Sequence, residues 1–510
     1  MPLSCPGMAA TGGSRTVTGP RSTSWSSRDP ALAALLVAAF VILRSAGMGS
    51  PVPEVWAALA SLVALFSPLA GFLAAVALGP FDDWSVLGTE AGGRAVLVGA
   101  LVISVAVRTL ARLPEWWRAR GALAELPALR TPAGVALAAA AVVFFGTGLG
   151  VIHTTVRFGP AAGYEAAELW GTGTGMALVV LLIGVFFGRQ GGSRASLVAA
   201  GAAAAAAIAV CIGLLHEALP SLIVSTPLGW LIAVDEEPLR LRGIMSAPNA
   251  MAMLALLAAC LVAAWMMHRR SLSVWLAGSA VLAVVALGVL LTFSRSAVLA
   301  LAAVAVSYAW YIRRSAAIVM LLVAVVGAAI LVPLYLEQRA GTPLAGVEGI
   351  LQGFFTVGDS VRASGWAAAI RMTLDSPLIG HGFRSYVLLH AQFGDPAQSA
   401  PHNEWLRLYA EQGVIVGTAG LVFLVAALTA LWQLARAVVW GGAVALGAFG
   451  VLVAYAIMAS FNNPLNYAQL NIPVFAVLGT ALGLALREGN SKRLSGPVAE
   501  ASRGSSAAGS

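Results

Sequence analysis

Charged residues are scarce in this chain: only 10% of its 510 residues are Asp, Glu, Lys or Arg, whereas 59% are hydrophobic. This scarcity excludes a soluble protein, because no soluble core of this size is so apolar. Helices satisfy their backbone groups internally within lipid, so repeated apolar runs of bilayer-spanning length predict a membrane fold. We expect an all-α, polytopic integral membrane protein with about 12 to 14 transmembrane helices.

Several chemical classes are excluded by what is missing. Three cysteines in a chain of this length give no disulfide framework or metal cluster. No phosphate-binding loop is present, which argues against ATP as an energy source. The histidines His381, His390 and His402 lack the ligand spacing typical of zinc. The sequence therefore predicts no cofactor and no metal.

The few positive charges orient the chain. The net charge of +8 resides mainly in short arginine-bearing loops, which favours contact with anionic membrane lipids and not with nucleic acid. Because these loops recur on every second connection, the positive-inside rule places them and both termini in the cytoplasm, in a cell (inner) membrane. An odd number of helices must then precede residue 94, unless the apolar run 54–80, which is one long helix or a tight hairpin at Pro68, is partly re-entrant.

Composition divides the chain into five parts. They are a disordered cytoplasmic tail (1–30), an N-terminal bundle of transmembrane helices (31–336), a long extracytoplasmic loop with short helices (337–403), C-terminal transmembrane helices (404–487) and a second disordered cytoplasmic tail (488–510). The loop of about 65 residues exceeds an ordinary connection several-fold, which is typical of a lid or binding element.

Within this loop, Asp359 and Ser360 can cap a helix that ends before Pro377. Arg362 and Trp366 share one face of that helix at i, i+4 spacing. Two interpretations are open: an amphipathic helix on the membrane surface, or a helix that turns Arg362 toward a substrate. The glycine-rich stretch 377–383 that follows predicts a tight turn.

A polar run, Pro401-His402-Asn403-Glu404 through Arg407 to Glu411 and Gly413, lies where this loop re-enters the membrane. Ionisable residues there are costly unless a cavity or a function retains them. Asn403 can cap the helix, which leaves His402 exposed at its N-terminal end. Arg407 stands at i, i+3 spacing from Glu404 and at i, i+4 spacing from Glu411, so the three either neutralise one another or take part in catalysis. For the lone His402, a structural and a catalytic role are both open.

Two further polar features face the same side. Ser294-Arg295-Ser296-Ala297 puts one arginine at an extracytoplasmic turn between two spans. Pro248-Asn249 begins another helix shortly after Arg242.

Together these residues resemble the O-antigen ligase and O-antigen polymerase superfamily of bacterial envelope glycan enzymes. The resemblance rests on the order of four signatures over about residues 240–420. They are Pro248-Asn249, the Ser294-Arg295-Ser296-Ala297 turn, the Arg362-x-x-x-Trp366 helix leading to Pro377-x-x-Gly380-x-Gly382, and His402-Asn403 followed by Glu411-x-Gly413. Members commonly have glycine where Ser296 stands here.

The resemblance implies that Arg295 and Arg362 bind the diphosphate of a lipid-linked glycan and that His402 activates the acceptor. Arg242, Asn249, Ser294, Trp366, Asn403 and Glu411 are candidate supporting residues. The chemistry is consistent: histidine titrates near neutrality and suits a general base, and guanidinium groups bind phosphate oxygens bidentately.

We therefore expect an O-antigen ligase-like, metal-independent membrane glycosyltransferase. Its donor is a polyprenyl (undecaprenyl-type) diphosphate-linked glycan, and its acceptor is a hydroxyl of a glycan, lipid or wall polymer on the extracytoplasmic face. A polymerase that joins repeat units is the alternative within the family. A lipid-linked glycan flippase or secondary transporter is the alternative from another class, although no internal repeat is evident.

Overall fold

The computed structural model describes residues 28–45, 52–81, 92–118, 130–219, 241, 243, 245, 247–269, 271–292, 294–313, 315, 318, 359–395, 400–437 and 441–506. All regular elements in these residues are helices, so the predicted all-α class is confirmed. Arg242, most of residues 315–336 and the first part of the long loop lie outside the described residues.

The helices in chain order are α1 (Arg28–Ser45), α2 (Val52–Phe66), α3 (Pro68–Leu78), α4 (Gly92–Arg118), α5 (Pro132–Phe158), α6 (Pro160–Thr172), α7 (Thr174–Gln190), α8 (Gly192–Ala218), α10 (Pro248–His268), α11 (Leu272–Leu291), α12 (Arg295–Ile312), α15 (Asp359–Asp375), α16 (Ser385–Leu389), α17 (Glu404–Ala437), α18 (Gly442–Ala459), the 3₁₀ helix η3 (Pro464–Asn466) and α19 (Ala468–Ser506). Among the described residues, nine helical stretches are long and apolar enough to cross a membrane, and three shorter apolar helices accompany them. These stretches agree with the predicted polytopic membrane protein.

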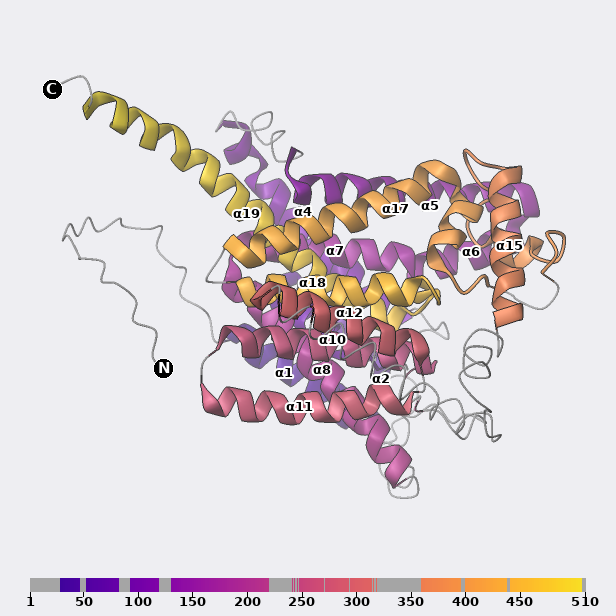
Figure 1. Cartoon of the computed structure of the whole chain (residues 1–510), viewed down its shortest axis with the longest axis horizontal. Helices are drawn as coiled ribbons and strands as arrows, with labels where there is room; N and C mark the ends of the chain where they lie inside the picture. Colours follow the sequence, from indigo (N-terminus) through magenta and orange to yellow (C-terminus); the bar gives the residue numbers. More distant parts are fainter. Residues whose placement is uncertain are drawn as a thin grey trace.

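The long helices run roughly side by side, so the bundle has two ends (Figure 1). At one, which we call the arginine end, Arg108, Arg189 and Arg194 line a single cavity. At the other, the loop end, α15 packs beside α17 (Figure 1). The backbone of α19 leaves the bundle and continues as a helix to Ser506, where the sequence predicts a tail from residue 488 (Figure 1).

Among the residues that the structure describes, three helices precede α4, and polar contacts hold their junctions. Ser67 adopts a non-helical conformation (φ −126°, ψ 79°), and Pro68 begins α3, because proline is favoured in the first turn of a helix. The Ser67 hydroxyl donates to Asp29 Oδ1 (2.6 Å) at the start of α1, and Arg108 near the end of α4 donates to the Phe66 carbonyl (2.9 Å). The run 54–80 is thus interrupted at Ser67, with its turn at the arginine end, and the orientation of these helices in the membrane stays a prediction.

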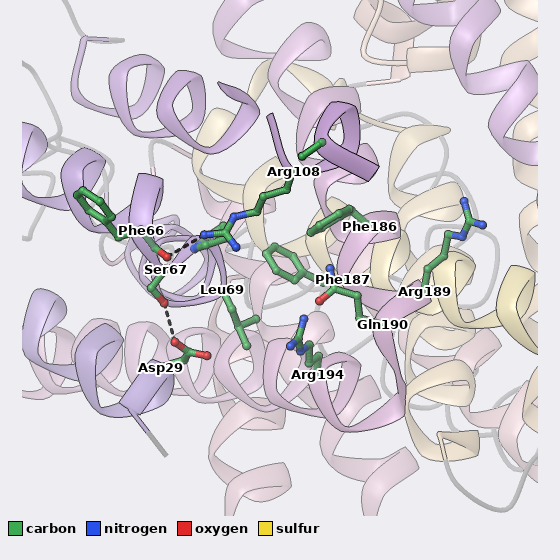
Figure 2. Close-up of a pocket in the computed structure, with 12 residues that line it drawn as sticks. Asp29, Phe66, Ser67, Leu69, Arg108, Phe186, Phe187, Arg189, Gln190 and Arg194 are labelled. Carbon is green, nitrogen blue, oxygen red and sulfur yellow. Dashed lines mark hydrogen bonds between the residues drawn. The ribbon is translucent and has the colours of Figure 1, made fainter. Parts of the chain in front are cut away.

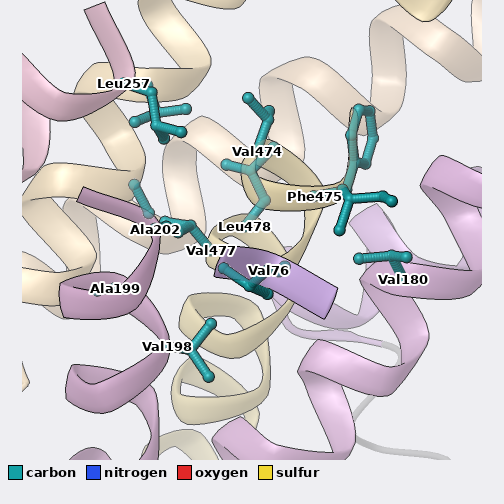
Figure 3. Packing of buried hydrophobic residues seen from close by; sticks show 14 of the residues in the cluster. Val76, Val180, Val198, Ala199, Ala202, Leu257, Val474, Phe475, Val477 and Leu478 are labelled. Atoms are coloured by element: carbon teal, nitrogen blue, oxygen red, sulfur yellow. The ribbon is translucent and has the colours of Figure 1, made fainter. Parts of the chain in front are cut away.

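The centre of the bundle is α19, where 94% of the apolar stretch is buried, against 22% for α11. Valine, leucine and alanine side chains from α3, α7, α8 and α10 surround it (Figure 3). Small residues bring α19 and α7 into backbone contact: a Cβ added at Gly188 would lie 2.0 Å from the Thr480 carbonyl oxygen, and one at Gly479 would lie 2.1 Å from that of Leu181. Such close approach is typical of helix packing in membranes.

Residues 153–173 are mostly helical. α5 continues to Phe158, and Pro160 begins α6, which folds back along α5. Gly163 permits this return, because a Cβ there would lie 2.1 Å from Thr155 Oγ1. These extensions of α5 and α6 form the base on which the loop-end site is built.

Candidate functional site

A small second core holds the loop end together. Ala368, Ala369 and Met372 of α15 pack against Tyr386 and Leu389 of α16 and against Ala410 of α17. The exposed side of α15 includes Ile370 (48%) and Leu374 (73%). One face of the predicted loop helix is therefore anchored to α17 and not free on the surface.

α17 is broken at Gly413, and the break receives the preceding turn. Gly413 has φ 74° and ψ −178°, a region available essentially to glycine alone. Because the helical hydrogen bonds are interrupted there, the Val414 amide donates instead to the Pro377 carbonyl (2.7 Å). A Cβ on Gly413 would lie 2.2 Å from the Leu378 carbonyl oxygen.

The glycine turn predicted at 377–383 provides the other half of this junction. Gly380 and Gly382 both have positive φ (65° and 102°). The Gly382 amide donates to the Glu411 carbonyl (2.8 Å), and a Cβ on Gly380 would lie 2.4 Å from the Glu411 carbonyl carbon. Two signatures that are separate in sequence, Pro377-x-x-Gly380-x-Gly382 and Glu411-x-Gly413, therefore interlock backbone to backbone.

Arg407 lies between two acids at the centre of the same helix segment. Its Nε donates to Glu404 Oε1 (3.1 Å), and its NH1 is 3.6 Å from Glu411 Oε2. All three side chains are buried, and Glu411 also accepts the amide of Tyr386 (3.3 Å). The ion pairs that the i, i+3 and i, i+4 spacings predicted are therefore present, and the role of these residues as supports of the helix after His402 stays a prediction.

His402 stands at the N-terminal end of this supported segment. Its backbone is left-handed (φ 49°), which is uncommon for a residue with a side chain. The predicted cap is present, because Asn403 Oδ1 accepts the Leu406 amide (3.1 Å). Burial and then the nearby charge of Arg362 lower the pKa of the half-buried His402 imidazole, while Asp395 opposes them. Arg362 and His402 are thus brought within electrostatic reach across 40 residues of chain.

Asp395 was not predicted as a site residue. Its carboxylate is fully buried and accepts hydrogen bonds from the Tyr386 hydroxyl (2.7 Å) and the Ser364 hydroxyl (3.0 Å). Burial and the Asp395 partner raise the pKa of Tyr386, which therefore stays a neutral donor. In sequence the residue stands between Gly394 and a proline, the pattern of an ordinary turn, so no local signal distinguishes it.

The turn that carries Arg295 joins a second polar cluster at the loop end. Ser294 caps α12 through its own side chain. Asn462 Nδ2 donates to the Ser296 hydroxyl (3.2 Å), and Asn249 Nδ2 donates to Asn462 Oδ1 (2.6 Å). Asn462 was missed by sequence reasoning, but it joins the predicted Asn249 to the predicted arginine turn.

An aromatic contact connects the two groups of residues. The rings of Trp366 and Phe461 have centroids 6.4 Å apart, and Phe461 immediately precedes Asn462. Arg362 lies one turn from Trp366 on α15, and both it and Arg295 are half-buried. The predicted signatures thus converge on one end of the bundle, with Arg362 near His402 and Arg295 on the asparagine cluster.

His381, by contrast, is structural. Only 1% of it is exposed, its Nδ1 accepts from Arg157 (2.8 Å), and its Nε2 lies 3.0 Å from the Met372 carbonyl, to which it donates. Burial lowers its pKa, so the neutral ring that can accept from Arg157 is favoured. Arg157 therefore binds a histidine, whereas Arg384 pairs with an acid, Glu165 (3.1 Å).

These features define the class: a polytopic α-helical membrane protein with a candidate histidine and arginine site at one end of its bundle. Residues 280–420 match the family model described as O-Antigen ligase. The match spans the Arg295 turn, α15 and the start of α17, and it confirms the resemblance to the O-antigen ligase and polymerase superfamily. A comparison with curated proteins gave no match.

Proposed function

We propose that the protein is an O-antigen ligase-like glycosyltransferase that transfers a glycan from a polyprenyl diphosphate carrier to an acceptor hydroxyl. The observation that carries this proposal is the approach of Arg362 to His402, a half-buried imidazole with a lowered pKa. A histidine kept neutral near physiological pH is suited to accept a proton, and a guanidinium beside it is suited to an anionic donor.

The reaction follows from these roles. His402 accepts the proton of the acceptor hydroxyl as its oxygen bonds to the anomeric carbon of the donor glycan. The bond from that carbon to the diphosphate oxygen breaks, and the carrier diphosphate leaves with the electron pair. Arg295 and Arg362 stabilise the negative charge that develops on it. Because diphosphate is a good leaving group, this chemistry requires no metal; among the described residues no three His, Cys, Asp or Glu side chains gather as metal ligands.

The orientation proposed here puts the loop end on the extracytoplasmic side of the cell membrane and both termini in the cytoplasm. It is supported by the gathering of Arg108, Arg189 and Arg194 at the opposite end, as the positive-inside rule requires. The donor would then reach His402 from the outer leaflet, and the acceptor would be a glycan, lipid or wall polymer.

The test is a transfer assay with membranes that contain lipid-linked glycan and acceptor. We expect His402→Ala and Arg295→Ala to abolish product while donor accumulates on the outer leaflet. Matched controls are His216→Ala, at the end of α8, and Arg313→Gln, which follows α12 at the opposite end from Arg295, and both should transfer normally. Wild-type product levels in both site variants would refute the catalytic roles.

The same assay separates the alternatives. Single-unit products favour a ligase, whereas ladders of repeat units made from the donor alone favour a polymerase. Donor that accumulates on the inner leaflet in the site variants would favour a flippase or secondary transporter.

A further inference from the structure

A cavity of about 680 Å³ lies at the arginine end, opposite the glycan site (Figure 2). It is enclosed by the start of α1, the junction of α2 and α3, the arginine-bearing part of α4, the end of α7 and the start of α8. No residue of the proposed transfer chemistry lines it. Its volume falls in the range of small-molecule sites, which is about 300 to 1,000 Å³.

The cavity carries unbalanced positive charge. Three arginines, Arg108, Arg189 and Arg194, line it together with one acid, Asp29. Asp29 Oδ1 already accepts the Ser67 hydroxyl (2.6 Å), and Arg108 donates to a backbone carbonyl and not to an acid. Within the described part of the chain, the Arg194 side chain makes neither a hydrogen bond nor an ion pair. Figure 2 shows Arg108 and Arg194 on different sides of Phe187, with Arg189 set apart to one side.

Apolar surface adjoins these charges. Phe186 and Phe187 form a wall of the cavity, and Phe66 at its edge is 78% exposed. On α4, Val107 (58%) and Leu110 (61%) are exposed on either side of Arg108. A ligand here meets guanidinium groups and an aromatic wall at one part and a lipid-facing apolar surface at another.

We propose that this cavity binds the phosphate-bearing headgroup of an anionic phospholipid. Guanidinium groups bind phosphate oxygens bidentately and keep their charge at any physiological pH. The acyl chains lie along the exposed apolar residues of α2 and α4. The proposed orientation places the cavity at the cytoplasmic leaflet, because arginine-rich ends face the cytoplasm. Basic pockets between transmembrane helices on that side bind anionic headgroups. The cavity joins α1 and the α2–α3 hairpin to α7 and α8, so the bound lipid cross-links these segments.

The experiment is native mass spectrometry and thermal melting of the full-length protein in detergent, with phosphatidylglycerol as the probe and phosphatidylcholine as the neutral comparison. We expect phosphatidylglycerol to stay bound and to raise the melting temperature, and phosphatidylcholine to do neither. Each arginine near an anionic headgroup accounts for roughly a fivefold change in affinity, so Arg194→Gln should weaken binding about fivefold and Arg108→Gln with Arg194→Gln about 25-fold.

Controls keep the result interpretable. Arg194→Gln breaks no polar contact of its side chain within the described residues, so its effect does not come from a bond lost to that part of the chain. Arg436→Gln removes the same charge from the same end, but Arg436 stacks on Trp432 (4.7 Å) outside the cavity, and its affinity should match the wild type. Unchanged phosphatidylglycerol retention in the double variant would overturn the proposal. Equal stabilisation by inorganic phosphate would also overturn it, because the ligand would then be a soluble anion. Neither measurement depends on glycan transfer.

Discussion

The junction between Gly413 and the 377–383 turn yields a quantitative prediction. Replacing Gly413 by alanine puts a Cβ in a backbone region that only glycine populates readily (φ 74°, ψ −178°), at a cost of about 1 to 3 kcal/mol. The same Cβ would lie 2.2 Å from the Leu378 carbonyl oxygen, and backbone cannot swing away as a flexible side chain can. Overpacking of this kind costs about 1 to 3 kcal/mol more.

The two costs together predict that Gly413→Ala destabilises the loop end by about 2 to 6 kcal/mol. The matched control is Gly171→Ala in α6, where a new Cβ meets nothing within 4 Å. Alanine in an open helical position is favourable by about 1 kcal/mol, so this variant should be neutral or slightly stabilised.

Hydrogen exchange followed by mass spectrometry measures this locally. We expect faster exchange of the 378–382 and 410–414 amides in Gly413→Ala, with unchanged exchange in the buried part of α19. Protection at the junction equal to that of Gly171→Ala and the wild type would refute the claim that the interlocked backbones stabilise the site.

Four further predictions concern His402 and the residues around it. Burial and the nearby charge of Arg362 lower the pKa of His402 below the ordinary 6.5, so the transfer rate should fall only below that pH. In a pH–rate profile, Arg362→Gln should move this acidic limb to higher pH, because the charge that lowers the pKa is removed. A shift to lower pH would contradict the assignment. Because the pKa of His402 is lower in the folded than in the unfolded protein, its contribution to the free energy of unfolding is complete above pH 6.5 and is lost as the pH falls through the folded pKa. Denaturation at several pH values measures this loss. Asp395→Asn removes the charge that opposes the lowering and should move the acidic limb to lower pH, and an unmoved limb would exclude Asp395 from the environment of His402. Asn403→Ala removes the helix cap at a cost of about 1 kcal/mol and should reduce kcat more than KM, whereas Asn403→Asp keeps an accepting oxygen and should retain activity; a silent Asn403→Ala would argue against positioning by the cap.

Local sequence signals predicted much of this structure. Hydropathy predicted the long apolar helices of the described residues, because this signal depends on the bilayer and not on tertiary contacts. The Asn403 cap and the Arg407 ion pairs were equally predictable, since their partners lie three or four residues away.

The long-range contacts were not predictable in this way. Nothing near Asp395 or Asn462 indicates that one lies by His402 and the other joins Asn249 to the Arg295 turn. The helix α6 was missed because its acids and glycines lower its hydropathy, while the packing of Gly163 on α5 stabilises it. Those contacts are decided by chain segments that lie far apart in sequence.

The length of the α17 segment before its break determines the direction in which the N-terminal end of the helix faces. The cap at Asn403 and the break at Gly413 bound nine helical residues, Glu404 to Gln412, and both boundaries are held by contacts outside the helix. Each residue added or removed between them would turn the N-terminal end by about 100° and move it by about 1.5 Å. His402 would then face away from Arg362 although every side chain of the site was still present. The direction in which the imidazole points is therefore encoded in the length of this segment as much as in its composition.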